Sequence, residues 1–512
     1  MVEIGGRDIG LGHFQKILFG GEPVVLDEKA LTDVENSFSF LKEFSREKVI
    51  YGINTGLGPM SQYRVQEKDR LALQYNLIRS HAAGSGYPLK DIHVRALMVA
   101  RLNTLMKGYS GIHPSVVILI KDFINKGIYP VIPRHGGVGA SGDLVQLAHL
   151  ALALIGEGEV IHNGERMAAS EAFSLTQLVP VSMHIREALA LINGTSAMSG
   201  IGIINVIYSR RLIEWAVAAS ALINEVVESY DDHFSVELNQ VKLHPGQMEI
   251  TGMMQKILSG SRLTHKRAEE LFNGVNGETI FTKKIQEYYS LRCITQILGP
   301  VIDTIRQAEQ VILNEINSVN DNPVIDYRNK NVFHGGNFHG DYVALEMDKL
   351  KIAITKLSML AERQLNFLMN DKLNGKLPPF VNLGVLGLNL GMQGAQFTAT
   401  STVAENQSFS TPAYIHSIPT NNDNQDVVSM GTNAALMTCR IIENSFEVMA
   451  IHLITLLQAI DYLRIEEKMA SITKNIYLEL RELVPVFVED HEMSPDIARM
   501  KQHLLQNNPG IA

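Results

Sequence analysis

Two long apolar stripes at helical spacing restrict the fold of this chain more than any other feature. The first starts at Met347, and its apolar residues are Leu350, Ile354, Leu357, Ala361, Leu365 and Leu368. Because they recur every three or four positions, they lie on one face of a helix. The second stripe runs from Ile442 to Leu463, long enough for roughly six turns. Helices of this length usually pack into bundles, so the stripes predict a mainly α fold.

The rest of the chain adds helices and few strands. Helical patterning also occurs at 144–155, 182–193, 197–230 and 283–316. Strand-like runs are short, as at Val24–Leu26 and Glu159–His162. Since 512 residues exceed one small domain, we expect an N-terminal domain at 1–200 and a helical bundle at 201–512. No flexible linker marks the boundary between them.

Charge and composition exclude several classes of protein. The formal charge of −9 comes from acidic and basic residues mixed along the chain, without the basic stripe that nucleic-acid binding needs. Met1–Gly12 lacks the basic end and apolar run of a secretory signal, and the longest apolar stretch, Leu144–Ile155, is about half a membrane span. We therefore expect a cytoplasmic protein without nucleic-acid or membrane partners. Cys293 and Cys439 are not spaced as a metal site, and we expect buried thiols.

Three segments rich in Gly, Asn and Pro interrupt the helical pattern, at 51–59, 135–143 and 408–426. Chemistry tends to be carried by loops on a rigid scaffold, so these segments are the first candidates for a site. The second precedes the apolar helix predicted at 144–155. Ser141 or Asp143 could cap that helix, and the glycines could bind a phosphate at its positive end. The spacing, however, matches neither the phosphate-loop signature nor the dinucleotide-binding fingerprint.

Ala140-Ser141-Gly142 also allows a chemical interpretation. If a tight turn brings the Gly142 nitrogen onto the Ala140 carbonyl carbon, the backbone can cyclise. Loss of two waters then leaves an electrophilic methylidene carbon derived from Ser141. Small residues permit the close backbone approach, Gly142 tolerates the strained geometry, and serine supplies the hydroxyl that leaves.

The segment Ala140-Ser141-Gly142-Asp143-Leu144 resembles the signature of the histidine and aromatic amino-acid ammonia-lyase family, and the chain looks closest to the bacterial tyrosine ammonia-lyases. Further blocks similar to that family follow its order along nearly the whole chain. They are Tyr51-Gly-Ile-Asn-Thr-Gly-Leu-Gly, Leu191-Ile-Asn-Gly-Thr-Ser, Tyr289-Ser-Leu-Arg-Cys, Asn320-Asp-Asn-Pro, Gly335-Gly-Asn-Phe-His and Asn424-Gln-Asp-Val-Val-Ser-Met-Gly.

The resemblance implies a fold, a prosthetic group and an assembly. The fold is the long-helix bundle of the fumarase and aspartase type, with a smaller N-terminal domain carrying the electrophile loop. The prosthetic group is a 4-methylidene-imidazol-5-one formed from Ala140, Ser141 and Gly142, without external cofactor or metal. The family assembles as a homotetramer in which neighbouring chains complete each pocket.

Site residues follow from the same resemblance. Tyr51 is the expected base that removes the β-proton, and positive helix ends would favour its phenolate form. Arg292 is expected to bind the substrate carboxylate with its planar fork. Asn193 and Tyr289 are expected to hydrogen-bond the oxygen of the electrophile. Further expected substrate contacts are Gly58, Gln286, Asn322 and Phe338. Without the resemblance, each of these side chains could equally serve packing, capping or an interhelical ion pair.

Two positions bear on the substrate. Gln425 occupies the place of a glutamate in the histidine-specific branch, and a neutral amide argues against an imidazole substrate. Ser80-His81 differs from the His-Leu and Phe-Leu pairs of well-known tyrosine and phenylalanine lyases, and is similar to histidine lyases and to some bacterial tyrosine enzymes. A histidine at the ring end could hydrogen-bond a phenol. We therefore predict elimination of ammonia from L-tyrosine to give trans-p-coumarate.

Other functions are compatible with the same residues. A tyrosine 2,3-aminomutase shares every residue named above and differs in its product, and a phenylalanine or histidine ammonia-lyase differs in its substrate. A helical scaffold without catalysis would keep Ser141 unmodified.

Overall fold

The computed structural model describes residues 1–272, 279–281 and 284–511. They form two compact units. The first comprises Met1–Ile207, Ala308–Asp348 and Pro412–Thr438, and the second comprises the described residues of Tyr208–Gln307, Lys349–Thr411 and Cys439–Ala512. The first unit thus joins the N-terminal part of the chain to two later segments, whereas the sequence predicted two continuous domains meeting at residue 200.

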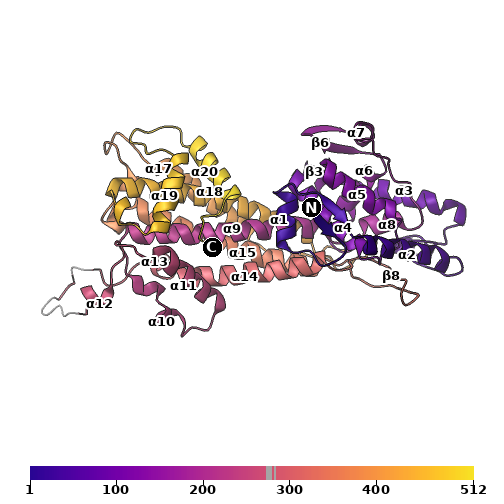
Figure 1. Ribbon diagram of the computed structural model, residues 1–512, viewed down its shortest axis with the longest axis horizontal. Coiled ribbons are helices and arrows are strands. Elements are labelled where there is room, and N and C mark those ends of the chain that lie inside the picture. The colour runs from indigo at the N-terminus through magenta and orange to yellow at the C-terminus, as the bar shows by residue number, and fades with distance from the viewer. Residues whose placement is uncertain (273–278, 282–283, 512) are drawn as a thin grey trace. The chain divides into compact units, whose positions relative to one another are not determined.

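The protein is mainly helical, with 59% of its described residues in helices (Figure 1). The α-helices are α1 (Leu11–Leu18), α2 (Glu28–Phe44), α3 (Arg70–His81), α4 (Asp91–Met106), α5 (Pro114–Lys126), α6 (Leu144–Leu154), α7 (Ala169–Thr176), α8 (Glu187–Ile192), α9 (Ser196–Val226), α10 (Val236–Asn239), α11 (Pro245–Leu258), α12 (Arg267–Glu270), α13 (Tyr289–Arg292), α14 (Ile294–Ile316), α15 (Asp341–Met369), α16 (Asp371–Asn374), α17 (Gln393–Phe409), α18 (Gly431–Leu463), α19 (Ser471–Leu483) and α20 (Ser494–Gln506). Short 3-10 turns are η1 (Gly58–Met60), η2 (Glu67–Asp69), η3 (Asp231–Phe234), η4 (Pro379–Val381) and η5 (Glu466–Lys468). The predicted mainly α fold is confirmed.

All strands of the described chain belong to the first unit. They are β1 (Val2–Ile4), β2 (Val24–Leu26), β3 (Ser85–Pro88), β4 (Ile128–Pro130), β5 (Pro133–His135), β6 (Glu159–His162), β7 (Glu165–Ala168), β8 (Val324–Asp326) and β9 (Asn331–Phe333). β1 pairs in parallel with β2, and the other pairings are antiparallel: β3 with β5, β6 between β4 and β7, and β8 with β9.

The helix boundaries correct several expectations. The segment predicted at 182–193 is helical only from Glu187, because Arg186 has a left-handed backbone conformation with φ of 66°. The segment predicted at 283–316 breaks at Cys293, between α13 and α14, and residue 283 lies outside the described part. α18 begins at Gly431, well before the apolar stripe that predicted it.

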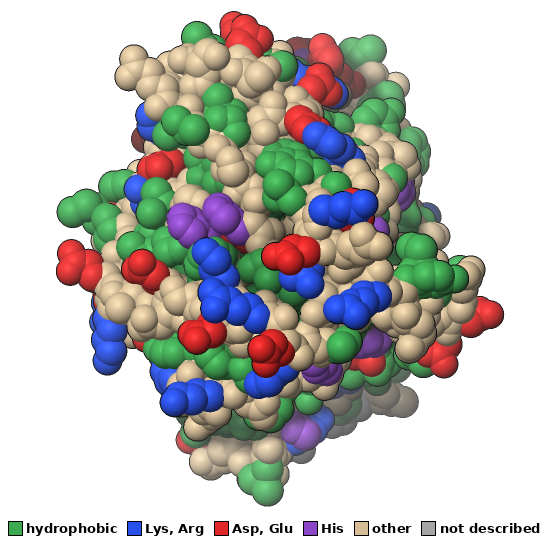
Figure 2. All heavy atoms as spheres, turned by 90° about the vertical axis from the view of Figure 1, so that its right-hand side faces the viewer, with side chains coloured by type: hydrophobic (Ala, Val, Ile, Leu, Met, Phe, Trp, Pro, Cys, Tyr) green, Lys and Arg blue, Asp and Glu red, His purple; other side chains and the backbone are tan. Residues whose placement is uncertain are grey.

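Burial explains which helices form the core. Within the first unit, nearly every residue of α4 from Val94 to Met106 is buried, and α4 packs on α5. α3, α6 and α8 pack against one another and carry the loops described below. Acidic and basic side chains are interspersed on the face shown in Figure 2.

α18 is the one helix in the described chain that is long and apolar enough to cross a membrane, but 78% of its most apolar window is buried inside the protein. Such burial is usual for a core helix. The two cysteines are free thiols and only half-buried, which corrects the expectation of full burial. The Cys439 thiol lies 3.6 Å from Oε1 of Glu443, one helical turn further along α18.

Candidate active site

A cavity of about 750 Å³ in the first unit gathers most of the predicted site residues. Those that line it are Tyr51, Gly58, Ser80, His81, Ser141, Asn193, Asn322, Phe338 and Gln425. They come from segments far apart in the chain, including the end of α3, the loop before α6 and the loop before α18. The fold of this unit therefore brings the three predicted loop segments to one cavity.

Ser141 is held by two amide side chains. Gln425 donates from Nε2 to the Ser141 hydroxyl at 2.8 Å, and Asn193 donates from Nδ2 to the Ser141 carbonyl oxygen at 3.2 Å. The first bond contacts the oxygen that must leave if the triplet cyclises, and the second contacts the carbonyl that would remain in the ring. Both contacts suit the predicted chemistry at Ser141.

Gly142 fits a backbone that cyclises. Its φ of +72° is a conformation that residues with side chains rarely adopt, and a Cβ there would lie 2.0 Å from the Gly194 carbonyl oxygen. That oxygen also accepts a hydrogen bond from the Asp143 N–H at 2.7 Å. The residues present therefore fit a prosthetic group made from Ala140, Ser141 and Gly142.

Asp143 corrects the idea that this loop caps the following helix. It stands at the N-terminal cap of α6 but makes no side-chain hydrogen bond there. Instead its carboxylate accepts the N–H groups of Ala197 and Met198, in the first turn of α9, both at 2.8 Å, and the hydroxyl of Thr432. Burial raises the pKa of Asp143 to about 6, although these three donors oppose the rise.

Tyr51 and Gly58 form the second element of the cavity. The Gly58 N–H donates to the Tyr51 phenol oxygen at 2.9 Å. A donor aimed at this oxygen stabilises a developing phenolate, which is the form that removes a proton. Asn421, from the loop before α18, lies against Gly58 and also lines the cavity.

His81 lies at the last residue of α3 and faces the cavity as a neutral ring. Its Nδ1 lies 3.0 Å from the Leu77 carbonyl oxygen, which can only accept, so Nδ1 carries the proton. Burial lowers the pKa of His81, which also favours the neutral form near pH 7. Nε2 then has a free lone pair. The neighbouring Ser80 donates its hydroxyl to the same Leu77 carbonyl at 3.2 Å.

A tight hairpin presents Gln425 to the cavity. Thr420 and Gln425 exchange two backbone hydrogen bonds, and the intervening Asn421, Asn422 and Asp423 all have positive φ, between 51° and 58°. Asn and Asp tolerate this conformation better than other side chains do, which explains the local sequence. Asn421 and Asn424 line the cavity but were not predicted from the sequence; the Asn-rich composition of the loop was the available signal.

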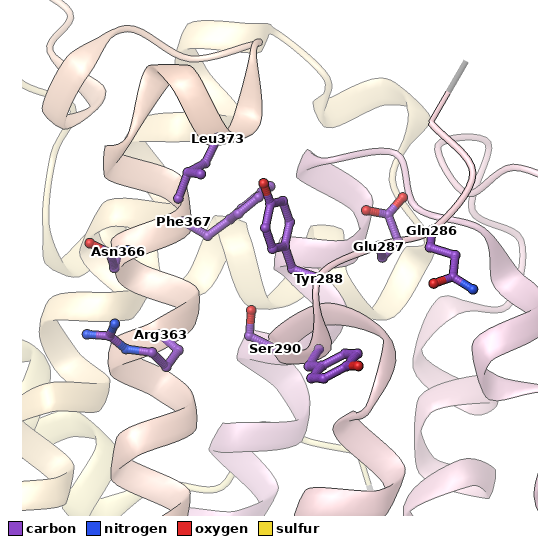
Figure 3. A pocket seen from close by; sticks show the side chains of 9 residues that line it. Gln286, Glu287, Tyr288, Ser290, Arg363, Asn366, Phe367 and Leu373 are labelled. Atoms are coloured by element: carbon purple, nitrogen blue, oxygen red, sulfur yellow. The ribbon is translucent and has the colours of Figure 1, made fainter. Parts of the chain in front are cut away.

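The remaining predicted residues belong to the second unit. Gln286 and Tyr289 line a separate hollow of about 530 Å³, where Tyr288 packs against Phe367 with ring centroids 5.3 Å apart (Figure 3). The guanidinium carbon of Arg292 lies 4.9 Å from the centre of the Tyr289 ring. Tyr289 itself is 70% exposed. These three residues are thus brought together within their own unit.

Comparison with known proteins defines the class of this enzyme. A family model described as aromatic amino acid lyase matches residues 9–482. A tyrosine 2,3-aminomutase from Myxococcus sp. (strain Mx-B0) is 39% identical, covering 97% of this chain and 95% of the relative. A histidine ammonia-lyase from Geobacillus sp. (strain WCH70) is 38% identical, covering 98% and 96%. The solved structure of a phenylalanine aminomutase from Pantoea agglomerans superposes with a TM-score of 0.95 at 34% identity, covering 99% of this chain and all of that one.

The chain belongs to the aromatic amino acid lyase family, whose members include ammonia-lyases and aminomutases. The predicted family, enzyme class and long-helix bundle are confirmed. The relatives differ in substrate and in product, so neither follows from membership of the family.

Proposed function

We propose that this protein is a tyrosine ammonia-lyase, which converts L-tyrosine to trans-p-coumarate and ammonia. The observation that carries the proposal is the single cavity that contains Ser141, Tyr51 and His81. They supply, in turn, the electrophile, a base for the β-proton, and an acceptor for a phenol. No external cofactor or metal is needed for these roles.

A 4-methylidene-imidazol-5-one formed from Ala140, Ser141 and Gly142 would supply an electrophilic carbon that activates the amino acid for loss of ammonia. Asn193 would keep its hydrogen bond to the ring oxygen, because the Ser141 carbonyl remains after cyclisation, whereas the Ser141 hydroxyl that Gln425 contacts leaves as water. A donor at the ring oxygen stabilises negative charge as it develops. The Tyr51 oxygen, supported by the Gly58 N–H, accepts the β-proton of the substrate.

Recognition of the phenol is assigned to His81. Because the Leu77 carbonyl fixes the proton on Nδ1, Nε2 can accept a hydrogen bond from the tyrosine hydroxyl. Phenylalanine would leave that nitrogen without a partner once the bound substrate covers it, and an unpaired polar atom in a covered site is disfavoured. Gln425 lacks the negative charge that would favour a histidine substrate.

Carboxylate binding is assigned to Arg292, and a further donor to the electrophile is assigned to Tyr289. We expect the enzyme to act in the cytoplasm as a homotetramer, with pockets completed by residues of neighbouring chains. The exposed Tyr289 supports this assembly, because a catalytic phenol needs a covered site.

A second candidate is a tyrosine 2,3-aminomutase, favoured by the 39% identical relative of that name. The two reactions share every residue assigned above and differ in whether ammonia is released or returned to the β-carbon.

One assay tests substrate and product together. The purified protein is incubated separately with L-tyrosine, L-phenylalanine and L-histidine, the near-ultraviolet absorbance is followed, and the tyrosine sample is chromatographed for β-tyrosine. Growth of p-coumarate from tyrosine alone is the expected result. Urocanate from histidine would contradict the substrate, and accumulating β-tyrosine would move the enzyme to the aminomutases.

A further inference from the structure

A buried arginine stands directly behind the segment that presses on the electrophile loop. Arg101, on α4, is fully buried and does not line the cavity. A buried guanidinium is costly to desolvate, and burial lowers the pKa of Arg101 to about 10.

Arg101 contacts the segment from Ala190 to Gly194 and the side chain of Asn320. Nη2 donates to the carbonyl of Ala190, in α8, and Nη1 donates to Oδ1 of Asn320 at 3.4 Å. The guanidinium also lies against Gly194, where a Cβ would be 2.3 Å from Nη1 and 2.7 Å from Oδ1 of Asn320, the atom that Nη1 binds. Gly194 has no room to move back toward α4.

The other side of the same segment contacts the electrophile loop at three successive residues. Asn193 donates to the Ser141 carbonyl, the Gly194 carbonyl lies against Gly142, and it also accepts the Asp143 N–H. Segment 193–194 therefore lies between Arg101 and the turn that must close. If it receded, the turn at Gly142 would lose the carbonyl that now holds its strained conformation.

We propose that Arg101 is a positioning residue for self-cyclisation: it holds Gly194 against Gly142 and so keeps the turn at 140–142 in the conformation that closes. This inference rests on the proposed function, since it assumes that the triplet cyclises. Arg101 touches neither the substrate nor the reacting atoms.

The step that Arg101 promotes balances without any further reactant. The Gly142 nitrogen forms a bond to the Ala140 carbonyl carbon, and that carbonyl oxygen leaves as water with the protons of the Gly142 and Ser141 N–H groups. The Ser141 hydroxyl then leaves as a second water with the Ser141 α-proton. The chain becomes lighter by two waters, about 36 Da, and no oxidant is consumed.

The test measures the mass of the intact full-length protein at intervals after synthesis, for wild type and for Arg101→Met. We expect cyclisation to slow roughly 10- to 100-fold, the effect of misplacing reacting groups by about an ångström. Circular dichroism checks that the variant is folded. If Arg101→Met yields no folded protein, the rate of mass loss is measured in Arg101→Lys instead. This variant retains the charge but lacks the planar fork, and the same slowing is expected.

Arg186 provides the matched control. It is also fully buried in the first unit, but its guanidinium binds Asp321 at 2.8 Å and the carbonyls of Ser110 and Pro323. A folded Arg186→Met should reach the wild-type mass at the wild-type rate. Equal slowing in both variants would show a general packing effect and overturn the role of Arg101.

The remaining outcomes separate the two claims. If wild type and Arg101→Met lose two waters at the same rate, the positioning role is overturned and the proposed function stands. Wild-type protein at its full unmodified mass would overturn both.

Discussion

The predicted site residues lie in two regions that are built differently. In the cavity of the first unit, both oxygens of Ser141 are hydrogen-bonded and Asp143 is fully buried. In the second unit, Tyr289 is 70% exposed, and the buried Nε of the neighbouring Arg292 has no hydrogen-bond partner among the described residues. The first region therefore has its reacting residue enclosed by hydrogen bonds, whereas the second exposes the aromatic side chain predicted for the site.

The largest effect is expected from Ser141→Ala, which removes the reacting group of the first region and leaves the second region unchanged. Without the hydroxyl no methylidene carbon forms, so activity should fall roughly a thousandfold or more while the fold persists. Product formation from L-tyrosine and intact mass measure the two consequences. A folded variant that retains substantial turnover would rule out the electrophile mechanism.

Tyr51→Phe should lower kcat by roughly 100- to 10,000-fold, because it removes the group that takes the β-proton. The mass deficit of two waters should remain, which distinguishes loss of the base from loss of the electrophile. Tyr63→Phe is the control, since Tyr63 also lines the cavity but is 72% exposed. A Tyr51→Phe enzyme as fast as Tyr63→Phe would show that another group is the base.

How far the sequence could predict these regions depends on the range of the contacts involved. α15 was predictable because its apolar stripe is a local pattern, and Ser141 was predictable because a short motif carries its chemistry. The hydrogen bond from Arg101 to Asn320 joins residues 219 positions apart, and no local pattern records it. The sequence position of Asp143 likewise predicts a cap for the adjacent α6, whereas its carboxylate accepts hydrogen bonds from the start of α9.

In the second region, local patterns also predicted the residues of the site but not where the helices end. The motif around Tyr289 and Arg292 was evident, and both residues fall on the short α13. The break at Cys293 was not evident, since the apolar pattern continues into α14. Periodicity therefore locates helices well and their ends poorly, because ends are set by capping and tertiary contacts.

Arg292→Met tests whether the second region serves catalysis. We expect kcat/KM for L-tyrosine to fall roughly 10- to 100-fold, the loss of a charge-assisted bond to the substrate carboxylate, with the mass deficit unchanged. Arg363→Met is the control, because Arg363 lines the hollow beside Tyr289, is largely exposed and pairs with Glu362. Equal activity of the two variants would remove Arg292 from the site.

His81→Phe addresses selectivity within the first region. Loss of the acceptor for the phenol should shift the ratio of kcat/KM for tyrosine over phenylalanine by about tenfold toward phenylalanine. His135→Gln, at an exposed histidine outside the cavity, should leave the ratio as it is. An unchanged ratio in His81→Phe would assign the choice of ring to other residues.

The smallest effect concerns two buried titratable groups, one in each unit, that differ in their hydrogen-bond partners. Asp143 in the first unit has three donors, whereas neither ring nitrogen of His452 on α18, in the second unit, has a partner among the described residues. Burial lowers the pKa of His452 to about 3. At pH values below the ordinary histidine pKa of about 6.5, the unfolded chain binds a proton at residue 452 that the folded chain does not bind. The free energy of unfolding therefore decreases as the pH falls from about 6.5 toward 3.

His452→Leu removes that penalty. Between pH 7.5 and pH 5 the variant should lose about 2 kcal/mol less stability than wild type, or a few degrees of thermal midpoint. Thermal unfolding at both pH values measures the difference, and His244→Gln, at an exposed histidine of the same unit, should follow the wild type. Parallel loss of stability in wild type and His452→Leu would mean that the imidazole is protonated inside the fold.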